Sequence, residues 1–274
     1  MKVALFQMTS GVDPASNARA LVDAVAQAAQ SGAQMLFTPE MSGCVDQDRK
    51  RSQAVITTQE KDPVLAAVRD AARAHGIWVH LGSLAVSDPA SDMRRNRAFL
   101  IDDQGAIRAH YDKIHLFDVD LPGGESWRES NSYVPGDRAV VAQTPLGRLG
   151  LTICYDLRFP DLFRALSNAR ADIIAVPAAF TVPSGEAHWH VLLRARAIES
   201  SAFVVATAQT GQHEDGRRTY GHSLVIDPWG TILLDAGDAP GLSFCELPLE
   251  RIADIRGRIP SLMHRRPIGD VVLS

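Results

Sequence analysis

The feature that most constrains the fold is a strand followed by a helix, a pattern that occurs twice within the first 81 residues. The apolar run from Val3 to Gln7 predicts a buried strand. Asp13-Pro14 then opens a helix, because Asp caps the first turn and Pro loses no hydrogen bond there. A second strand is predicted from Met35 to Glu40, a second helix opens at Asp62-Pro63, and the next strand runs from Ile77 to Leu81. This alternation favours a sheet with helices packed against it.

The rest of the chain adds hairpins and short strands. Arg97 to Ile101 and Ile107 to Tyr111 flank a turn that ends in Gly105, as in a β-hairpin. Strands outnumber helices by roughly two to one, which fits a purely parallel doubly wound sheet poorly. We therefore predict an α/β fold in which two mixed β-sheets pack face to face and are flanked by helices. The other predicted strands are Leu149 to Cys154, Ile173 to Val176, Phe203 to Thr207, His222 to Ile226, Thr231 to Leu234 and Leu242 to Glu246, and the other helices are Asp161 to Ala169 and Ala187 to Ser201.

Composition narrows the class of protein and of partner. Of the 274 residues, 46% are apolar, which is enough for a sizeable core. No linker divides the chain, so we expect a single domain over residues 1–274. The 28 basic and 32 acidic residues give a net charge of −4, without the basic excess typical of proteins that bind nucleic acid or anionic membranes. No apolar run is long enough to span a membrane. A small-molecule partner is therefore expected.

The cysteines indicate the compartment. Cys44, Cys154 and Cys245 are far apart in the sequence, which fits neither a disulfide framework nor a C-x-x-C metal or redox pair. The N-terminal apolar run is too short for a signal peptide. We therefore expect a cytoplasmic protein.

Common catalytic motifs are missing. The sequence has no G-x-S-x-G nucleophile elbow, no phosphate-binding loop, no G-x-G-x-x-G after a strand and no H-E-x-x-H pair. His188 and His190 lie two residues apart on a predicted helix, so they point to different faces. This spacing predicts packing or polar contacts for them rather than a metal site.

Three side chains at strand ends are candidates for chemistry. Cys154 ends a predicted strand and is followed at once by a turn into a helix, where backbone N–H groups would stabilise a thiolate or an oxyanion. Glu40 lies at the end of the predicted strand that begins at Met35, and Lys113 lies just beyond the predicted strand that ends at Tyr111. Taken singly, Cys154 is more simply explained as an inert buried thiol, and the other two as solvated surface residues. A long loop is predicted at Leu121 to Asp137, and loops of that length are usually functional or disordered.

The combination resembles a known family. MLFTPEMSG around Glu40, HYDKIHLFD around Lys113 and GLTICYDLRFPDLFRAL around Cys154 occur in the order found in the nitrilase (carbon-nitrogen hydrolase) superfamily. The resemblance covers nearly the whole chain, since VALFQM, ESNSYVPGD, AHWHVLLRARAIES, YGHSLVIDPWG and HRRP also match. Within the superfamily the sequence is most similar to the Nit-type amidases.

This resemblance implies a four-layer α-β-β-α sandwich that pairs into dimers, and hydrolysis of non-peptide C–N bonds without a metal or other cofactor. It implies that Glu40 is the general base, Lys113 the lysine that stabilises the transition state, and Cys154 the nucleophile. Glu129 matches a second glutamate that orients the lysine. In this chemistry Lys113 lowers the pKa of the thiol, the thiolate attacks the amide carbon, and the ammonium holds the oxyanion together with the backbone N–H of Tyr155. A thioester intermediate follows.

The resemblance also narrows the substrate. The run Cys154-Tyr155-Asp156 is similar to amidases and carbamoylases rather than to nitrilases proper, and the stretch from Ala208 to Gly230 favours deaminated glutathione, cleaved to 2-oxoglutarate and cysteinylglycine. The alternatives are an omega-amidase, an N-carbamoyl hydrolase, an aliphatic nitrilase, or a non-catalytic interaction protein on the same fold. A carboxylated substrate requires cationic groups in the pocket, and the unassigned candidates are Arg158, Arg194, Arg196, Arg217 and Arg218.

The predicted helix from Ala187 to Ser201 bears on assembly. Its apolar face is wide enough to be buried on two sides, as a helix that meets both the core and a partner would need. With the resemblance, this predicts a homodimer or a multiple of dimers.

Overall fold

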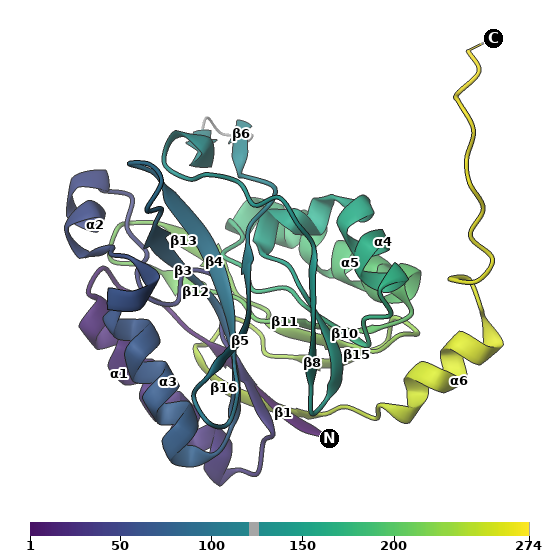
Figure 1. Cartoon of the computed structure of the whole chain (residues 1–274), viewed down its shortest axis with the longest axis horizontal. Helices are drawn as coiled ribbons and strands as arrows, with labels where there is room; N and C mark the ends of the chain where they lie inside the picture. Colours follow the sequence, from purple (N-terminus) through teal and green to yellow (C-terminus); the bar gives the residue numbers. More distant parts are fainter. Residues whose placement is uncertain (121–125, 274) are drawn as a thin grey trace.

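Two six-stranded sheets pack between layers of helices in the computed structural model, which describes residues 1–120 and 126–273 (Figure 1). The predicted α/β fold of two mixed sheets flanked by helices is confirmed. Part of the predicted loop, residues 121–125, lies outside the described residues. Among the described residues, no helix is both long and apolar enough to cross a membrane.

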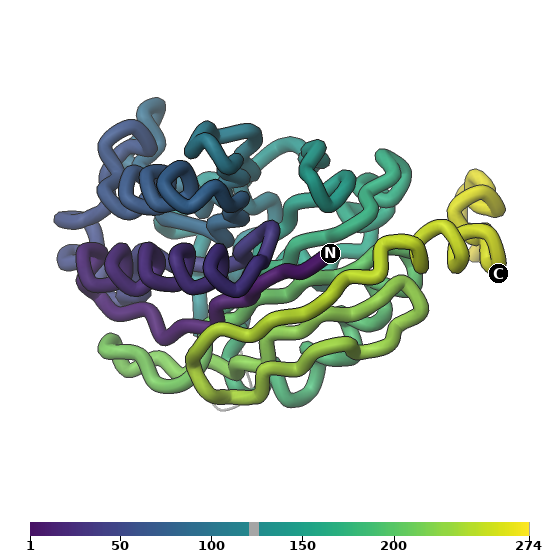
Figure 2. The backbone as a smooth tube through the Cα atoms, turned by 90° about the horizontal axis from the view of Figure 1, so that it is seen from below, coloured from purple at the N-terminus to yellow at the C-terminus, as the bar shows by residue number. Residues whose placement is uncertain are grey.

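The first sheet combines parallel and antiparallel pairing. Its three central strands β1, β2 and β3 are parallel, and antiparallel strands flank them on both sides. Helices α1 and α3 lie side by side on its outer face (Figure 2). The strand order is β16 (Gly241–Glu246), β1 (Lys2–Gln7), β2 (Met35–Phe37), β3 (Trp78–Ser87), β4 (Arg94–Ile101) and β5 (Ile107–Asp112), and the helices are α1 (Pro14–Gln30) and α3 (Pro63–His75).

The second sheet repeats this pairing pattern. Its parallel strands β9, β10 and β11 lie between antiparallel strands. Helices α4 and α5 pack on the face of this sheet that is turned away from the first sheet. The strand order is β15 (Ile232–Asp235), β14 (Leu224–Ile226), β11 (Phe203–Ala206), β10 (Ile173–Ala175), β9 (Gly147–Leu151) and β8 (Val140–Thr144), and the helices are α4 (Pro160–Asn168) and α5 (Val182–Ser200).

Alternation along the strands builds two cores. On β1, Val3 and Leu5 belong to the core between the two sheets, whereas Ala4 packs in the core beneath α1 and α3. On β2, Phe37 and Leu36 divide between the two cores in the same way. Both faces of these strands are therefore buried, which explains why they appear in the sequence as nearly continuous apolar runs.

The structure confirms the capping residues that the sequence predicted at two helix ends. The Asp13 carboxylate accepts hydrogen bonds from the backbone N–H groups of Ala15 and Ser16, and Gly76 ends α3 with a φ of +61°. The boundary predicted for the long helix was wrong, because α5 begins at Val182 rather than Ala187. Pro183 occupies its first turn, where a proline loses no hydrogen bond.

Several short elements were not predicted. Helix α2 (Arg49–Val55) and the hairpin β6 (Asp118–Asp120) with β7 (Ser126–Arg128) lack a periodic apolar face. Helix α6 (Glu250–Arg258) buries only Ile252 and Ile255, and the chain beyond it extends away from the sandwich (Figure 1). The remaining short elements are η1 (Gln59–Lys61), η2 (Glu129–Asn131), η3 (Cys154–Arg158), β12 (Thr210–Gln212) and β13 (Arg218–Tyr220).

Candidate active site

Glu40 lies just beyond the end of β2, where the chain runs close to β3. Its side chain is buried, and the Thr38 N–H donates to the His80 carbonyl, so the segment continues beside β3 after the strand has ended. A Cβ at Gly82 would overlap the carbonyl oxygens of Thr38 and Pro39. Glycine at this position therefore allows the backbone that carries Glu40 to approach the sheet closely.

Lys113 directly follows β5, as the sequence predicted, and bridges two carboxylates. Its Nζ lies 2.9 Å from Glu40 Oε1 and 2.9 Å from Glu129 Oε2. Glu129 is held in turn by the backbone N–H of Phe117, which donates to Oε2 at 2.7 Å. Lys113 is 2% exposed, so this ammonium depends on the two carboxylates in place of water.

Cys154 does not end a strand, and that prediction was wrong. Strand β9 stops at Leu151, and Cys154 is the first residue of η3, with a φ of +51°. Its N–H donates to the Pro177 carbonyl at 2.8 Å. The left-handed backbone turns the chain sharply into η3 and leaves the thiol at the wall of a cavity.

The fully buried Asp156 ties the turn that carries Cys154 to the loop that carries Lys113. Its carboxylate accepts from the Tyr111 hydroxyl at 2.7 Å, from the Ile153 N–H at 2.9 Å and from the His115 N–H at 3.1 Å. Tyr111 belongs to β5 of the first sheet, whereas Ile153 lies two residues beyond the end of β9 of the second sheet and directly before Cys154. One carboxylate thus couples the two halves of the site.

The charges of Glu40 and Lys113 stabilise each other. Burial alone would raise the pKa of Glu40, but the Lys113 ammonium and hydrogen bonds from Cys154, Lys113 and Asn96 lower that pKa below its usual value. Burial alone would lower the pKa of Lys113, but the charges of Glu129 and Glu40 raise it well above its usual value. At neutral pH the site therefore contains a carboxylate and an ammonium.

The thiol is protonated in the resting site. Burial and the charge of Glu40 raise the pKa of Cys154 well above its usual value, and the opposing effect of Lys113 is smaller. Lys113 lowers the pKa of this thiol, as expected, but by less than burial and the charge of Glu40 raise it. Because the thiol is hydrogen-bonded to Glu40, its proton has an acceptor within reach.

Two groups in the site were missed by sequence reasoning. Asn96 on β4 donates from Nδ2 to Glu40 Oε1 at 2.9 Å and to Glu129 Oε1 at 3.2 Å. The backbone N–H of Ala179 donates to Glu40 Oε2 at 3.0 Å and also stabilises the Cys154 thiolate. An asparagine within a buried strand is a sequence signal that could have revealed Asn96. The contribution of a backbone N–H, such as that of Ala179, has no signal in the sequence.

A cavity of about 440 Å³ opens above these groups. Glu40, Lys113, Cys154, Glu129 and Tyr155 all line it, so the structure brings together every predicted site residue. Aromatic and cationic side chains form much of the remaining wall. Of the five candidate arginines, Arg158 and Arg217 line the cavity and Arg194, Arg196 and Arg218 do not, whereas Arg49, Arg94 and Arg128, which were not predicted, do.

The fold and this cluster define a class of protein. The chain belongs to the carbon-nitrogen hydrolase family, whose model matches residues 2–257. It is 40% identical over 272 residues to a deaminated glutathione amidase of Yersinia enterocolitica, a match that covers 98% of this chain and 94% of that protein. The chain is accordingly a hydrolase of the amidase kind, which sets aside the non-catalytic alternative.

Solved structures agree with this assignment. The NitFhit protein of Caenorhabditis elegans superposes with a TM-score of 0.90 at 37% identity, covering 97% of this chain and 65% of that one. A mutant of the amidase from Nesterenkonia sp. AN1 superposes with a TM-score of 0.81 at 29% identity, covering 97% of this chain and 94% of that one. In that amidase the acetamide moiety of fluoroacetamide is attached covalently to the active-site cysteine.

Proposed function

We propose that this amidase hydrolyses a small carboxylated amide, deaminated glutathione above others, through a thioester on Cys154. The observation that carries the proposal is the convergence of a buried carboxylate, ammonium and thiol on one cavity. Glu40 is the general base, Lys113 the cation that stabilises the transition state, and Glu129 the residue that orients Lys113. The name of the Yersinia enterocolitica relative supports the substrate.

The acylation half begins with proton transfer from the Cys154 thiol to Glu40. Sγ then attacks the amide carbon, and the electrons of the C=O bond move to oxygen. The Lys113 ammonium and the backbone N–H of Tyr155 hold the resulting oxyanion. When the tetrahedral intermediate collapses, the C–N bond breaks, Glu40 returns its proton to the leaving amine, and the acyl group remains on sulfur as a thioester.

The deacylation half uses the same base. Glu40 takes a proton from water, hydroxide attacks the thioester carbon, and the C–S bond breaks to release the acid. Glu40 then returns its proton to the thiolate of Cys154. The resting charges suit both acylation and deacylation, because the lowered pKa of Glu40 leaves its carboxylate unprotonated before each nucleophilic attack.

Charge in the cavity supports a carboxylated substrate. Among the described residues, Arg49, Arg94 and Arg158 line the cavity and form no ion pair with a carboxylate. Deaminated glutathione is a keto-acid amide with a carboxylate at each end, and guanidinium groups bind carboxylates well. We propose that these arginines recognise the two ends of the substrate.

A panel of substrates tests the proposal. We expect cysteinylglycine release from deaminated glutathione to exceed ammonia release from a keto-acid amide or a nitrile, and ammonia plus CO2 release from a carbamoyl compound. Cys154→Ala should lose at least about 10⁴-fold in turnover, because it removes the nucleophile. Mass spectrometry of the wild-type enzyme quenched during turnover should find the acyl group on Cys154. Turnover by Cys154→Ala at the wild-type rate would refute the mechanism, and preference for another substrate would refute only the substrate.

We further propose that the chain is one carbon-nitrogen hydrolase domain and forms dimers, or multiples of dimers, across α5. On this helix Val191 is 69% exposed and Ile198 is 49% exposed, and the nearby Trp229 is 55% exposed. Burying such side chains against a second copy would remove apolar surface from water. A monomer mass by light scattering at working concentration would contradict the dimer. The three free thiols suit a reducing compartment, so we propose the cytoplasm.

A further inference from the structure

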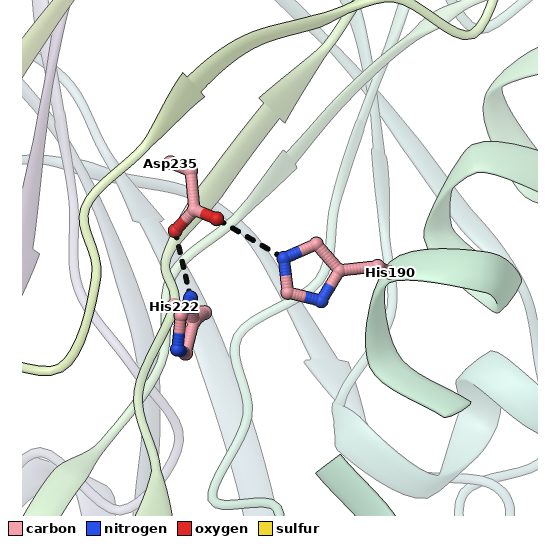
Figure 3. Close-up of side chains that lie close together, drawn as sticks. All are labelled: His190, His222 and Asp235. Atoms are coloured by element: carbon pink, nitrogen blue, oxygen red, sulfur yellow. Dashed lines mark hydrogen bonds and ion pairs between the residues drawn. The ribbon is translucent and has the colours of Figure 1, made fainter. Parts of the chain in front are cut away.

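A second cluster of titratable side chains lies outside the cavity. His190 projects from α5, His222 from the segment before β14, and Asp235 from the end of β15 (Figure 3). His190 Nε2 lies 3.1 Å from Asp235 Oδ2, and His222 Nδ1 lies 2.9 Å from Asp235 Oδ1. The sequence spacing of His188 and His190 predicted packing or polar contacts for both, and His188 Nδ1 lies 3.3 Å from a guanidinium nitrogen of Arg158. The fold instead supplies His190 with two partners that are distant in the sequence.

The donor set is one that zinc and similar ions use. Within the described part of the chain, one ligand atom from each of the three side chains lies within 4.8 Å of the other two. Zinc binds imidazole nitrogen and carboxylate oxygen at about 2.0–2.2 Å, which places neighbouring ligands of a tetrahedral ion about 3.4 Å apart. The separation of each imidazole nitrogen from its own Asp235 oxygen, 3.1 Å and 2.9 Å, is already close to this value, so small side-chain movements would bring the three ligands around one ion.

Neighbouring groups hold two of the three side chains in position. The Gly237 N–H donates to Asp235 Oδ1 at 2.9 Å, and the His222 N–H donates to the Gly237 carbonyl at 2.7 Å. The Trp189 indole N–H donates to the His222 carbonyl at 2.7 Å, and the Tyr220 ring stacks on the His222 ring with centroids 4.5 Å apart. Such outer groups fix ligand orientation in metal sites.

The cluster is open to solvent. The side chains of His190, His222 and Asp235 are 30%, 27% and 36% exposed. An ion can therefore reach them from solution, and water can complete its coordination. This openness also separates the cluster from the buried site of Glu40, Lys113 and Cys154.

We propose that His190, His222 and Asp235 bind one divalent transition-metal ion of the zinc class. The ion replaces the two N–H hydrogen bonds to Asp235: each neutral imidazole moves its proton to the other ring nitrogen and binds through the freed lone pair. It joins α5 to the end of β15 and so stabilises the outer side of the second sheet. It takes no part in amide hydrolysis.

Titration with Zn²⁺ and Co²⁺ after dialysis against EDTA tests this proposal. Every chain in the test carries Cys154→Ala, so that the thiol in the cavity does not bind the ion. The two ligand variants are His190→Ala, at a helix position that accepts alanine, and Asp235→Asn, which keeps the side-chain shape. His222 is left unchanged because its φ of +54° strains an alanine. The matched control is His75→Ala, an exposed histidine at the end of α3.

We expect the parent chain and the His75→Ala control to bind one equivalent of Zn²⁺, to melt at a higher temperature with it, and to show the visible absorption of bound Co²⁺. His190→Ala and Asp235→Asn should each bind at least about tenfold more weakly and lose the thermal shift. Circular dichroism in EDTA checks folding, and His190→Gln replaces either variant if it fails to fold. Equal Zn²⁺ affinity in the parent and the ligand variants, or no binding by the parent, would overturn the proposal.

Discussion

The two six-stranded halves share one pattern of strand pairing but contribute different groups to the cavity. In the first half, β2 leads to Glu40 and β5 leads to Lys113. In the second, β9 leads to Cys154, and β10, the counterpart of β2, leads to Ala179, which contributes only its backbone N–H. The topology thus fixes where strand ends meet, and the side chains at those ends decide the chemistry. Neither half carries both the proposed nucleophile and the proposed base.

The counterpart of Cys154 in the first half is Ser10, which follows β1 at the same distance as Cys154 follows β9. Ser10 is buried and accepts a hydrogen bond from Gln209 Nε2 at 2.6 Å. The same amide donates to the Glu40 carbonyl oxygen at 2.9 Å. Ser10 therefore helps to hold Gln209, which in turn binds the backbone of the proposed base. The Ser10 hydroxyl takes part in a hydrogen-bond network of uncharged groups.

Within the first half, the largest expected effect comes from removing the proposed base. Glu40→Gln keeps the shape of the side chain but takes away its basicity, and we expect a loss of about 10²–10⁴-fold in kcat. Steady-state assays on the substrate that the panel selects measure this loss. An unchanged kcat would mean that the base comes from elsewhere.

Removing the Asp156 carboxylate, which links the two halves of the site, should have a smaller effect. In Asp156→Asn the amide N–H₂ replaces an oxygen that accepts from a backbone N–H, and we expect about 2–3 kcal/mol less stability toward urea together with reduced kcat. Tyr111→Phe removes only one of the donors to Asp156 and serves as a milder comparison. Wild-type stability in Asp156→Asn would show that the halves are coupled by packing alone.

Crowding the backbone beneath Glu40 gives a third test. Gly82→Ala forces a methyl group against the Thr38 and Pro39 carbonyls, and we expect about 1–3 kcal/mol of destabilisation with a shift of Glu40 that lowers kcat. The matched control is Gly257→Ala in α6, where a Cβ meets no atom within 4 Å. Equal stability of the two variants would contradict the close approach.

The smallest expected effect is that of pH near neutrality. The lowered pKa of Glu40 and the raised pKa values of Lys113 and Cys154 keep the carboxylate, ammonium and thiol unchanged, so kcat/KM should be flat between about pH 6 and 8. The stability that Glu40 contributes is complete above its ordinary pKa of 4.5 and is lost as pH falls through its lower folded value. A bell-shaped profile centred near pH 7 would indicate a histidine instead.

Sequence reasoning predicted the layers, and it selected the three side chains that the structure brings to one cavity, because both predictions follow from local signals. Asp13 and Gly76 mark helix ends, and Glu40, Lys113 and Cys154 lie within matching motifs. Other features depend on contacts between distant segments. The net rise in the pKa of the thiol reflects burial and the charge of Glu40, neither of which spacing reveals. The cluster of His190, His222 and Asp235 likewise exists only once α5 packs against the second sheet.

The amide of Ala179 serves two neighbouring acids. It donates to Glu40 while that group is a carboxylate, and it also stabilises sulfur when the thiol becomes an anion. Negative charge can therefore pass from oxygen to sulfur beneath a fixed dipole that does not have to turn. A proton exchanged within such a rigid frame crosses a lower barrier than one that waits for solvent to rearrange, which is the benefit of preorganisation.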